Sequence, residues 1–249
     1  MPHFVMLPNL PNHRISVAAV GEDYADIIST ALEPFGITAL SCNRNCFVDK
    51  RLSSHIDLSV FHHGEKKFTL AKTLYGSAFS NELSKTGADI SYSAADFSPQ
   101  YPNDASLCAL SNGSKLFHNE SFCDTNIKSC HGEKLVHVNQ GYAKCSVCLI
   151  NETAAISSDV GLIRAMRNQG MDVLEISSGG IELTGFAYGF IGGAAFKISA
   201  DELAFTGNIN THPNKAEILS FLELHEIKPI FLTNRPIFDI GSVLPITEF

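Results

Sequence analysis

The chain has 249 residues, of which 45% are hydrophobic and 18% are charged, and it contains no tryptophan. That length is enough to bury a sizeable core, so the chain should fold without disulfides or structural metal ions. The formal charge of −8 is spread thinly along the chain. A surface that follows nucleic-acid phosphates is therefore not expected, and nucleic acid is a poor candidate partner.

The N-terminal segment shows no basic stretch followed by an apolar core and a small-residue cleavage site, so it does not resemble an export signal. The longest segment that lacks both charge and strong polarity, 185–196, is too short for the ~20 residues that a membrane-spanning helix needs. Seven cysteines, an odd number, favour reduced thiols over a disulfide framework. These observations predict a cytoplasmic protein that does not interact with a membrane.

Taken in chain order, the hydrophobic pattern predicts a repeated unit of strand, turn, strand, helix and strand. Gly36, Gly87 and Gly170 stand where helices end, and Ser158 or Asp159 stands where one begins. The predicted elements are strand 14–20, helix 22–34 and strand 37–41; strands 55–60 and 67–71 and helix 77–85; strand 105–110, a second strand ending at 117, helix 120–130 and strand 135–138; strands 145–150 and 153–156, a helix ending at 169 and strand 172–176; strands 194–198 and 203–206, helix 214–225 and strand 229–232; and strand 242–246.

The junctions in front of the first strand of each unit recur regularly. Asp57, Asp104, Cys145, Gly193 and Gly241 follow one another at intervals of about 45 residues, and an apolar strand comes after each. No single unit can bury both of its faces, so five units should pack side by side in a ring. The C-terminal strand has no helix and the N-terminal part has no first strand, so the two ends complete one unit.

The sequence therefore predicts an α/β fold with a single domain over 1–249. Its architecture is a five-bladed α/β propeller of ββαβ units around a pseudo-five-fold axis, closed by the N- and C-terminal strands. The junction residues would then converge at one end of the axis. The alternative is an open α/β sheet whose even spacing is coincidental.

Three junctions carry recognisable motifs. His55-Ile-Asp57 resembles a His-x-Asp signature, and GYAKCSVCLI, 141–150, resembles a Gly-x-x-Arg/Lys-Cys nucleophile segment. Between them, Asn103 precedes Asp104 at the second junction. In the order and spacing of these motifs, the chain resembles the guanidino-modifying enzymes, the pentein superfamily of arginine deiminases and dimethylarginine dimethylaminohydrolases, as an uncharacterised branch. Those enzymes carry an asparagine at the junction where Asn103 stands.

One departure from that family concerns the order of the junctions. Its well-studied members carry the histidine and cysteine junctions in the C-terminal half, whereas two further units follow Cys145 here. A cyclic rotation of a closed ring leaves the spatial arrangement unchanged. The resemblance then places 190–193 and 238–241 where the family keeps a substrate-binding aspartate and a histidine-orienting glutamate. The first segment has no carboxylate, which argues against ordinary arginine-like specificity, and the second offers Asp239 to orient the histidine.

The resemblance implies a cysteine-dependent hydrolase or amidinotransferase that acts on a small cationic guanidino or amidino compound. Cys145 would attack the guanidinium carbon and form a covalent thiouronium intermediate, with its pKa lowered by Lys144, a cationic His55 or the substrate. His55 would protonate the leaving amine and then activate water. Asp57 would hold the guanidinium through charge-assisted hydrogen bonds.

The remaining implied groups bind the substrate. Asp104 or Asp239 would supply a second anion, Asn103 would occupy its junction as in the family, and Lys144 would lie beside the nucleophile. The chemistry needs no metal ion or cofactor. Asp104 also has a simple reading as a turn residue, because it follows Pro102 and Asn103.

Other readings of these residues stay open. Cys145-x-x-Cys148 has the spacing of a redox pair or of half a zinc site, for which Cys42-x-x-x-Cys46 would supply the other two ligands. Strand alternation, however, points Cys148 away from Cys145 and towards the core. His62 and His63 follow a strand and are interpreted as solvated or turn residues.

The glycine-rich segment 179–196 lacks the strand-to-helix context of a phosphate loop, so a dinucleotide site is rejected. Its glycines are interpreted as allowing close backbone approach at the axis or leaving room for a substrate. Glu182, within this segment, is an additional candidate carboxylate. The alternative function is a catalytically silent ring of the same fold that binds a macromolecular partner, as a ribosome-associated translation initiation factor of this architecture does.

Overall fold

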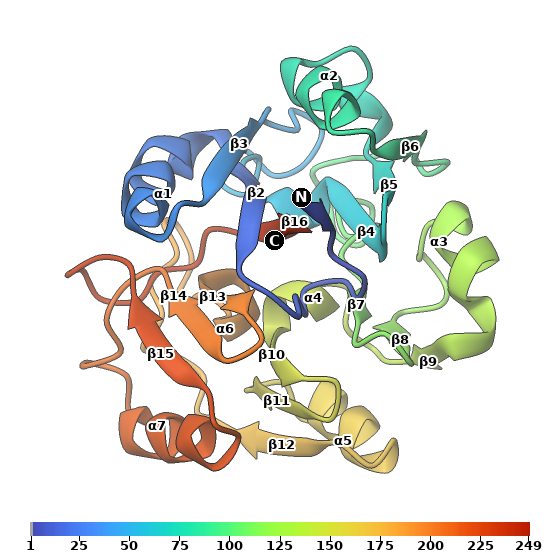
Figure 1. Cartoon of the computed structure of the whole chain (residues 1–249). Coiled ribbons are helices and arrows are strands. Elements are labelled where there is room, and N and C mark those ends of the chain that lie inside the picture. The colour runs from blue at the N-terminus through green and yellow to red at the C-terminus, as the bar shows by residue number, and fades with distance from the viewer. Residues whose placement is uncertain (1) are drawn as a thin grey trace.

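The computed structural model describes residues 2–249. Five small sheets surround a common axis, and the longer helices lie on the outside of the ring (Figure 1). Four of the sheets have three strands and one has four. In each three-stranded sheet the first two strands are antiparallel and the third runs parallel to the second, which is the ββαβ arrangement.

Four of the five blades are formed from consecutive elements. In chain order these are β4 (Val60–Gly64), β5 (Lys67–Leu70), α2 (Ala78–Lys85) and β6 (Asp89–Tyr92); β7 (Leu110–Ser111), β8 (Leu116–His118), α3 (Thr125–His131) and β9 (Leu135–His137); β10 (Val147–Asn151), β11 (Ala154–Ser157), α5 (Val160–Asn168) and β12 (Asp172–Glu175); and β13 (Ala195–Ser199), β14 (Glu202–Phe205), α7 (Lys215–Leu224) and β15 (Lys228–Phe231).

The remaining blade joins the two chain ends. The C-terminal strand β16 (Leu244–Glu248) pairs antiparallel with β2 (Ile15–Gly21), and α1 (Ala25–Leu32) connects β2 to the parallel strand β3 (Thr38–Cys42). The short strand β1 (His3–Phe4) adds to the other edge of β16. The predicted five-bladed ring closed by both termini is confirmed, and the open-sheet alternative is wrong.

Burial follows position in the blade. Strands β10, β13 and β14 are almost entirely buried, whereas the third strands β6, β12 and β15 consist of exposed and partly buried residues, with Val173 of β12 as the one buried residue. Inner strands pack on both faces, which explains their continuous apolar sequences. The predicted caps are also observed, since Asp159 accepts a hydrogen bond from the backbone N–H of Leu162 and Gly170 has a φ of 81°.

Three junctions differ from the predicted strands. His55 precedes one turn of 3₁₀ helix, Ile56–Leu58, and the strand begins only at Val60. Cys145 lies in the one-turn helix α4 (Ala143–Ser146), and the strand begins at Val147. Of the strand predicted over 105–110, only its last residue belongs to β7. A short apolar run does not distinguish a buried turn from a buried strand, and the chain must turn where it reaches the axis.

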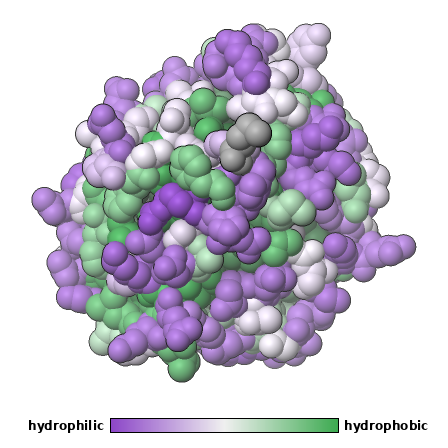
Figure 2. Space-filling model, in the orientation of Figure 1, coloured by the Kyte–Doolittle hydropathy of each residue, from purple (hydrophilic) through white to green (hydrophobic). Residues whose placement is uncertain are grey.

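The fifth blade begins in the same way, with the one-turn helix α6 (Ile191–Ala194) in front of β13. Within residues 2–249, no helix is both long and apolar enough to cross a bilayer. On the face shown in Figure 2, hydrophilic and hydrophobic side chains are intermixed.

Candidate active site

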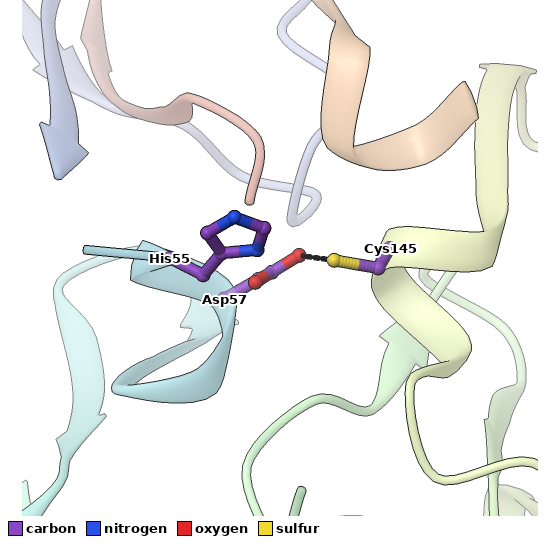
Figure 3. Close-up of side chains that lie close together, drawn as sticks. All are labelled: His55, Asp57 and Cys145. Atoms are coloured by element: carbon purple, nitrogen blue, oxygen red, sulfur yellow. Dashed lines mark hydrogen bonds between the residues drawn. The ribbon is translucent and has the colours of Figure 1, made fainter. Parts of the chain in front are cut away.

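The junctions bring three reactive side chains together. His55 and Asp57 come from the turn in front of β4, and Cys145 comes from α4 (Figure 3). One nitrogen of His55, one carboxylate oxygen of Asp57 and Sγ of Cys145 lie within 4.8 Å of one another. The Cys145 thiol donates a hydrogen bond of 2.6 Å to Oδ2 of Asp57.

Two of these residues, His55 and Cys145, form the polar floor of a pocket, whereas Asp57 is buried beside it. His55, Cys145 and Asp239 line a cavity of about 300 Å³, together with Tyr142 and several apolar residues. Nε2 of His55 and Oδ1 of Asp57 are buried without a hydrogen-bond partner. A buried polar atom without a partner is costly. Two such atoms therefore remain without a partner beside the Cys145 thiol.

Asp239 is held beside the His55 ring. Its Oδ1 lies 3.9 Å from Nδ1 of His55 and accepts a hydrogen bond of 2.9 Å from the backbone N–H of Gly241. Its Oδ2 accepts one of 2.8 Å from the backbone N–H of Phe190. A Cβ atom at Gly193 would overlap the Asp239 carboxylate. The glycine at the fourth junction thus makes room for the carboxylate of the fifth, in agreement with the prediction that glycines allow close approach at the axis.

Lys144 lies beneath the floor rather than in the pocket. Its side chain is buried, and Nζ donates hydrogen bonds of 2.9 Å to Oγ of Ser242 and 3.3 Å to the carbonyl oxygen of Gly192. With Asp57 it lines a second cavity of about 20 Å³, which has room for a single water molecule. Lys144 therefore acts on the site through its charge, which lowers the pKa of Asp57.

Burial dominates the electrostatics of the floor. It raises the pKa of the Asp57 carboxyl to about 6, against the opposing charges of His55 and Lys144. The pKa of the Cys145 thiol lies well above its usual value because of a hydrogen bond with the Cys108 thiol, burial, and the negative charge of Asp57. The sequence suggested the opposite direction, a thiol pKa lowered by Lys144 and His55, and that suggestion is wrong for the protein by itself. The hydrogen bond with Cys108 and burial contribute most to the raised thiol pKa, and the charges of Asp57 and Asp239 add to it.

Asn103 and Asp104 do not reach the reactive group. Asn103 is exposed, and its amide nitrogen donates a hydrogen bond of 3.1 Å to Oγ of Ser98. Asp104 is buried and accepts a hydrogen bond of 2.7 Å from the hydroxyl of Tyr142, whose ring lines the pocket. Asp104 thus supports a wall of the pocket. Tyr142 was not recognised from the sequence, although it stands three residues before the cysteine in the nucleophile motif.

The remaining candidate residues lie elsewhere or play other parts. Cys148 is buried in a core cluster with Ile150 and Ile191, as predicted. Glu182 is exposed, and its carboxylate lies 3.8 Å from the guanidinium of Arg235. His62 is not solvated as expected, because its ring is buried and stacks on Phe68 with centroids 4.3 Å apart.

All seven cysteines are free thiols. In the described part of the chain, His55, Asp57 and Cys145 form the one group of three potential metal ligands, and the two cysteine pairs of the sequence form none. Nitrogen, oxygen and sulfur atoms at such a spacing could hold a zinc ion. The same trio equally fits a nucleophile with its acid–base partner and a cation-binding carboxylate.

A sequence profile matches residues 19–244, nearly the whole chain, and is described as a family of unknown function, DUF6873. The chain belongs to this family. A search of curated proteins finds no match to the sequence.

Solved structures share the fold at low sequence identity. The inosamine-phosphate amidinotransferase of Streptomyces griseus has a TM-score of 0.59 and 9% identity, with 97% of each chain covered. A substrate-bound agmatine deiminase of C. jejuni has a TM-score of 0.56 and 11% identity, covering 98% of this chain and 96% of that one. An amidinotransferase of saxitoxin biosynthesis from Microseira wollei has a TM-score of 0.51 and 11% identity, covering 89% and 91%. The resemblance to the pentein superfamily is confirmed at the level of the fold.

Proposed function

We propose that this protein is a cysteine-dependent enzyme that hydrolyses or transfers the amidino group of a small guanidino or amidino compound. The observation that carries this proposal is the convergence of Cys145, His55 and Asp239 on one pocket, with Asp57 bonded to the Cys145 thiol. Fold neighbours that are amidinotransferases and a deiminase support it. The seven free thiols support the expected cytoplasmic setting.

Substrate binding would supply the charge that the thiol needs. A guanidinium placed against Asp57 and Asp239 donates hydrogen bonds to their carboxylates and offsets their negative charge. The pKa of Cys145 then falls, because Asp57 and Asp239 contribute to raising it. The reaction would therefore be substrate-assisted, and the thiol of the free protein would react slowly with neutral reagents.

In the first half-reaction, the Cys145 thiol releases its proton to solvent as the cationic substrate binds, and the Sγ thiolate then forms a bond to the guanidinium carbon. The C–N bond to the leaving nitrogen breaks, and that nitrogen takes a proton from His55 and departs as ammonia or an amine. The remaining group is a thiouronium cation on Cys145. Asp239, 3.9 Å from Nδ1, would stabilise the protonated ring before the transfer.

In the second half-reaction, the neutral His55 ring takes a proton from a water molecule that attacks the thiouronium carbon. The C–S bond breaks, the Cys145 thiolate is regenerated, and a ureido compound leaves. An attacking amine in place of water would complete an amidino transfer. The two half-reactions need no metal ion or organic cofactor.

The test is alkylation of the protein with 2-chloroacetamidine, which carries a cationic amidine, and with neutral iodoacetamide at pH 7. The modified cysteine is located by peptide mass spectrometry. We expect 2-chloroacetamidine to modify Cys145 in preference to the other six cysteines. This preference should be lost in Asp57→Ala and kept in Asp96→Ala, a control that removes an exposed aspartate.

Amidine labelling spread evenly over several cysteines would contradict the proposal. Cys145 would then be an ordinary buried thiol. The alternative of a silent ring that binds a macromolecule would replace the enzyme, and an affinity search for its partner would follow.

A further inference from the structure

The walls above the reactive floor are apolar. Only His55, Cys145 and Asp239 contribute charged or reactive groups to the pocket, and all three lie at its floor. The remaining wall is mainly aromatic and aliphatic: Leu58, Tyr142, Leu183, Phe186, Tyr188 and Phe190. Tyr188 and Phe190 form an edge-to-face pair with ring centroids 6.3 Å apart. Such a wall favours the uncharged body of a ligand.

No cation is positioned to receive a carboxylate from the substrate. In residues 2–249, neither lysine nor arginine lines the pocket. Arg51 lies beside it, but Nε and Nη2 bond the Asp49 carboxylate and Nη1 bonds the carbonyl oxygen of Gly185. The guanidinium carbon also lies 4.0 Å from the centroid of the Phe186 ring. Three of the guanidinium nitrogens thus already have acceptors in the protein, although about half of the side chain faces solvent.

A second positive charge on the substrate would also lack a partner. Glu182, the acidic residue of the nearby glycine-rich segment, does not line the pocket and faces Arg235. Of the carboxylates that remain, Asp239 lines the floor of the pocket and Asp57 is bonded to the Cys145 thiol, so both would hold the reacting head group. A charge carried higher in the pocket would lose its hydration against apolar walls without compensation.

We propose that the substrate is a monocation: an amidine or guanidinium head on an uncharged aryl or alkyl body, rather than an amino acid or a diamine derivative. This inference rests on the proposed function. The cavity of about 300 Å³ accommodates a head group and a small body. Each methylene buried against the walls should increase the rate of reaction at low concentration about fourfold.

The test uses 2-chloroacetamidine and three derivatives that differ only at the end of an N-substituent: pentyl, 4-carboxybutyl and 5-aminopentyl. Sγ of Cys145 displaces chloride from each, and the second-order rate constant at Cys145 is measured by mass spectrometry. We expect the pentyl reagent to react at least about 10-fold faster than the parent and than both charged derivatives. Selective labelling by the parent without faster labelling by the pentyl reagent would overturn the inference and leave the proposed function standing. Unselective labelling by the parent would overturn both.

A pair of matched variants tests the wall directly. Tyr188→Arg places a cation in the pocket wall, whereas Tyr75→Arg places one at an exposed tyrosine of the blade that contains α2. We expect Tyr188→Arg to raise the rate of the carboxybutyl reagent relative to the pentyl reagent about 10-fold, and Tyr75→Arg to leave that ratio unchanged. An unchanged ratio in Tyr188→Arg, or an equal change in both variants, would contradict the placement of the substrate body against this wall.

Discussion

The one-turn helices α4 and α6 occupy equivalent places in neighbouring blades, directly in front of β10 and β13. Helix α4 has the sequence AKCS and carries Lys144 and Cys145, whereas α6 has the sequence IGGA and carries Gly192 and Gly193. The same one-turn helix thus carries a lysine and a nucleophilic cysteine in one blade and two glycines at the matching positions of the next.

The glycines of α6 are required by what faces them. A Cβ atom at Gly192 would overlap the carbonyl oxygens of Lys144 and Val147, and one at Gly193 would overlap the carboxylate of Asp239. Lys144 also donates a hydrogen bond to the carbonyl oxygen of Gly192. The α4 repeat therefore provides the reactive thiol, and the α6 repeat provides the space into which the α4 backbone and the Asp239 carboxylate pack. Substitutions in α4 should remove the reactive group, whereas substitutions in α6 should displace the groups around it.

The largest effect is expected on the α4 side, from Cys145→Ser. The hydroxyl is a much weaker nucleophile than the thiolate, so turnover of any guanidino substrate should fall about 10⁴-fold or more. Amidine-selective labelling should disappear, while the other cysteines should react with iodoacetamide as before. The fold should persist because the change is nearly isosteric. Residual selective labelling at another cysteine would place the nucleophile elsewhere.

The next effect concerns Asp57, which faces Cys145. Burial raises the pKa of the Asp57 carboxyl from 3.8 to about 6. Its contribution to the stability of the folded protein is therefore complete below pH 4, where the carboxyl is protonated, and is lost as the pH rises through 6, where it ionises. Asp57→Asn removes the cost of the buried charge, and we expect the variant to be more stable than the parent at pH 7 by about 3 kcal/mol.

The gain should vanish near pH 4, as measured by denaturant unfolding at several pH values. Asp57→Asn should also speed the reaction of Cys145 with neutral iodoacetamide, because the Asp57 charge helps to raise the thiol pKa. A variant that is less stable than the parent at pH 7 would mean that Asp57 is held as an ion pair rather than as a strained carboxylate.

On the α6 side, Gly193→Ala should disturb the site without removing any reactive group. The added methyl overlaps the Asp239 carboxylate, which must move. A displacement of order 1 Å should reduce amidine-selective labelling about 100-fold, and the overpacking should cost about 1–3 kcal/mol of stability.

Gly132→Ala is the matched control, because a Cβ atom there meets nothing within 4 Å. It should leave both labelling and stability nearly unchanged. If Gly193→Ala is as stable and as selective as the parent, then the site does not need a glycine at this position of α6.

The sequence allowed the repeat and most of the junctions to be predicted. Blade order, closure by the termini and the convergence of His55, Asp57 and Cys145 all follow from hydrophobic patterning and even spacing. The turns at the axis could not be predicted. The segment that leads into β4, HIDLSV, alternates polar and apolar residues as a strand does although it forms a turn, and the turn that leads into β10 is as buried as the strand. Periodicity therefore gives no sign of where either strand begins.

The electrostatic state of the site was also beyond the sequence. Adjacent Lys144 suggested a lowered thiol pKa, but its ammonium bonds Ser242 beneath the floor. The Cys108 thiol, burial and two carboxylates instead raise that pKa. These contacts join residues from different blades, so no local pattern encodes them. Tyr142, within the nucleophile motif, was overlooked for a related reason, because its hydrogen-bond partner Asp104 lies in the preceding junction.

The smallest effect is expected from Tyr142→Phe, which tests the role of the tyrosine hydroxyl. Tyr142→Phe keeps the ring in the pocket wall and removes the hydroxyl that bonds Asp104, leaving a buried carboxylate oxygen unpaired. We expect a loss of stability of about 1–2 kcal/mol at pH 7, measured by urea unfolding, with amidine selectivity changed by less than about threefold. Burial raises the pKa of Asp104 and the Tyr142 hydrogen bond opposes that rise. The loss should therefore shrink at low pH, where Asp104 is protonated in both proteins.

Tyr75→Phe, at an exposed tyrosine, is the control and should change neither quantity. A large loss of selectivity in Tyr142→Phe with unchanged stability would reverse the assignment. The hydroxyl would then act on the substrate, and Asp104 would belong to the reactive floor with Asp57 and Asp239. Because α4 begins directly after Tyr142, the α4 side would then contribute a proton donor as well as the nucleophile, and its contrast with α6 would be greater still.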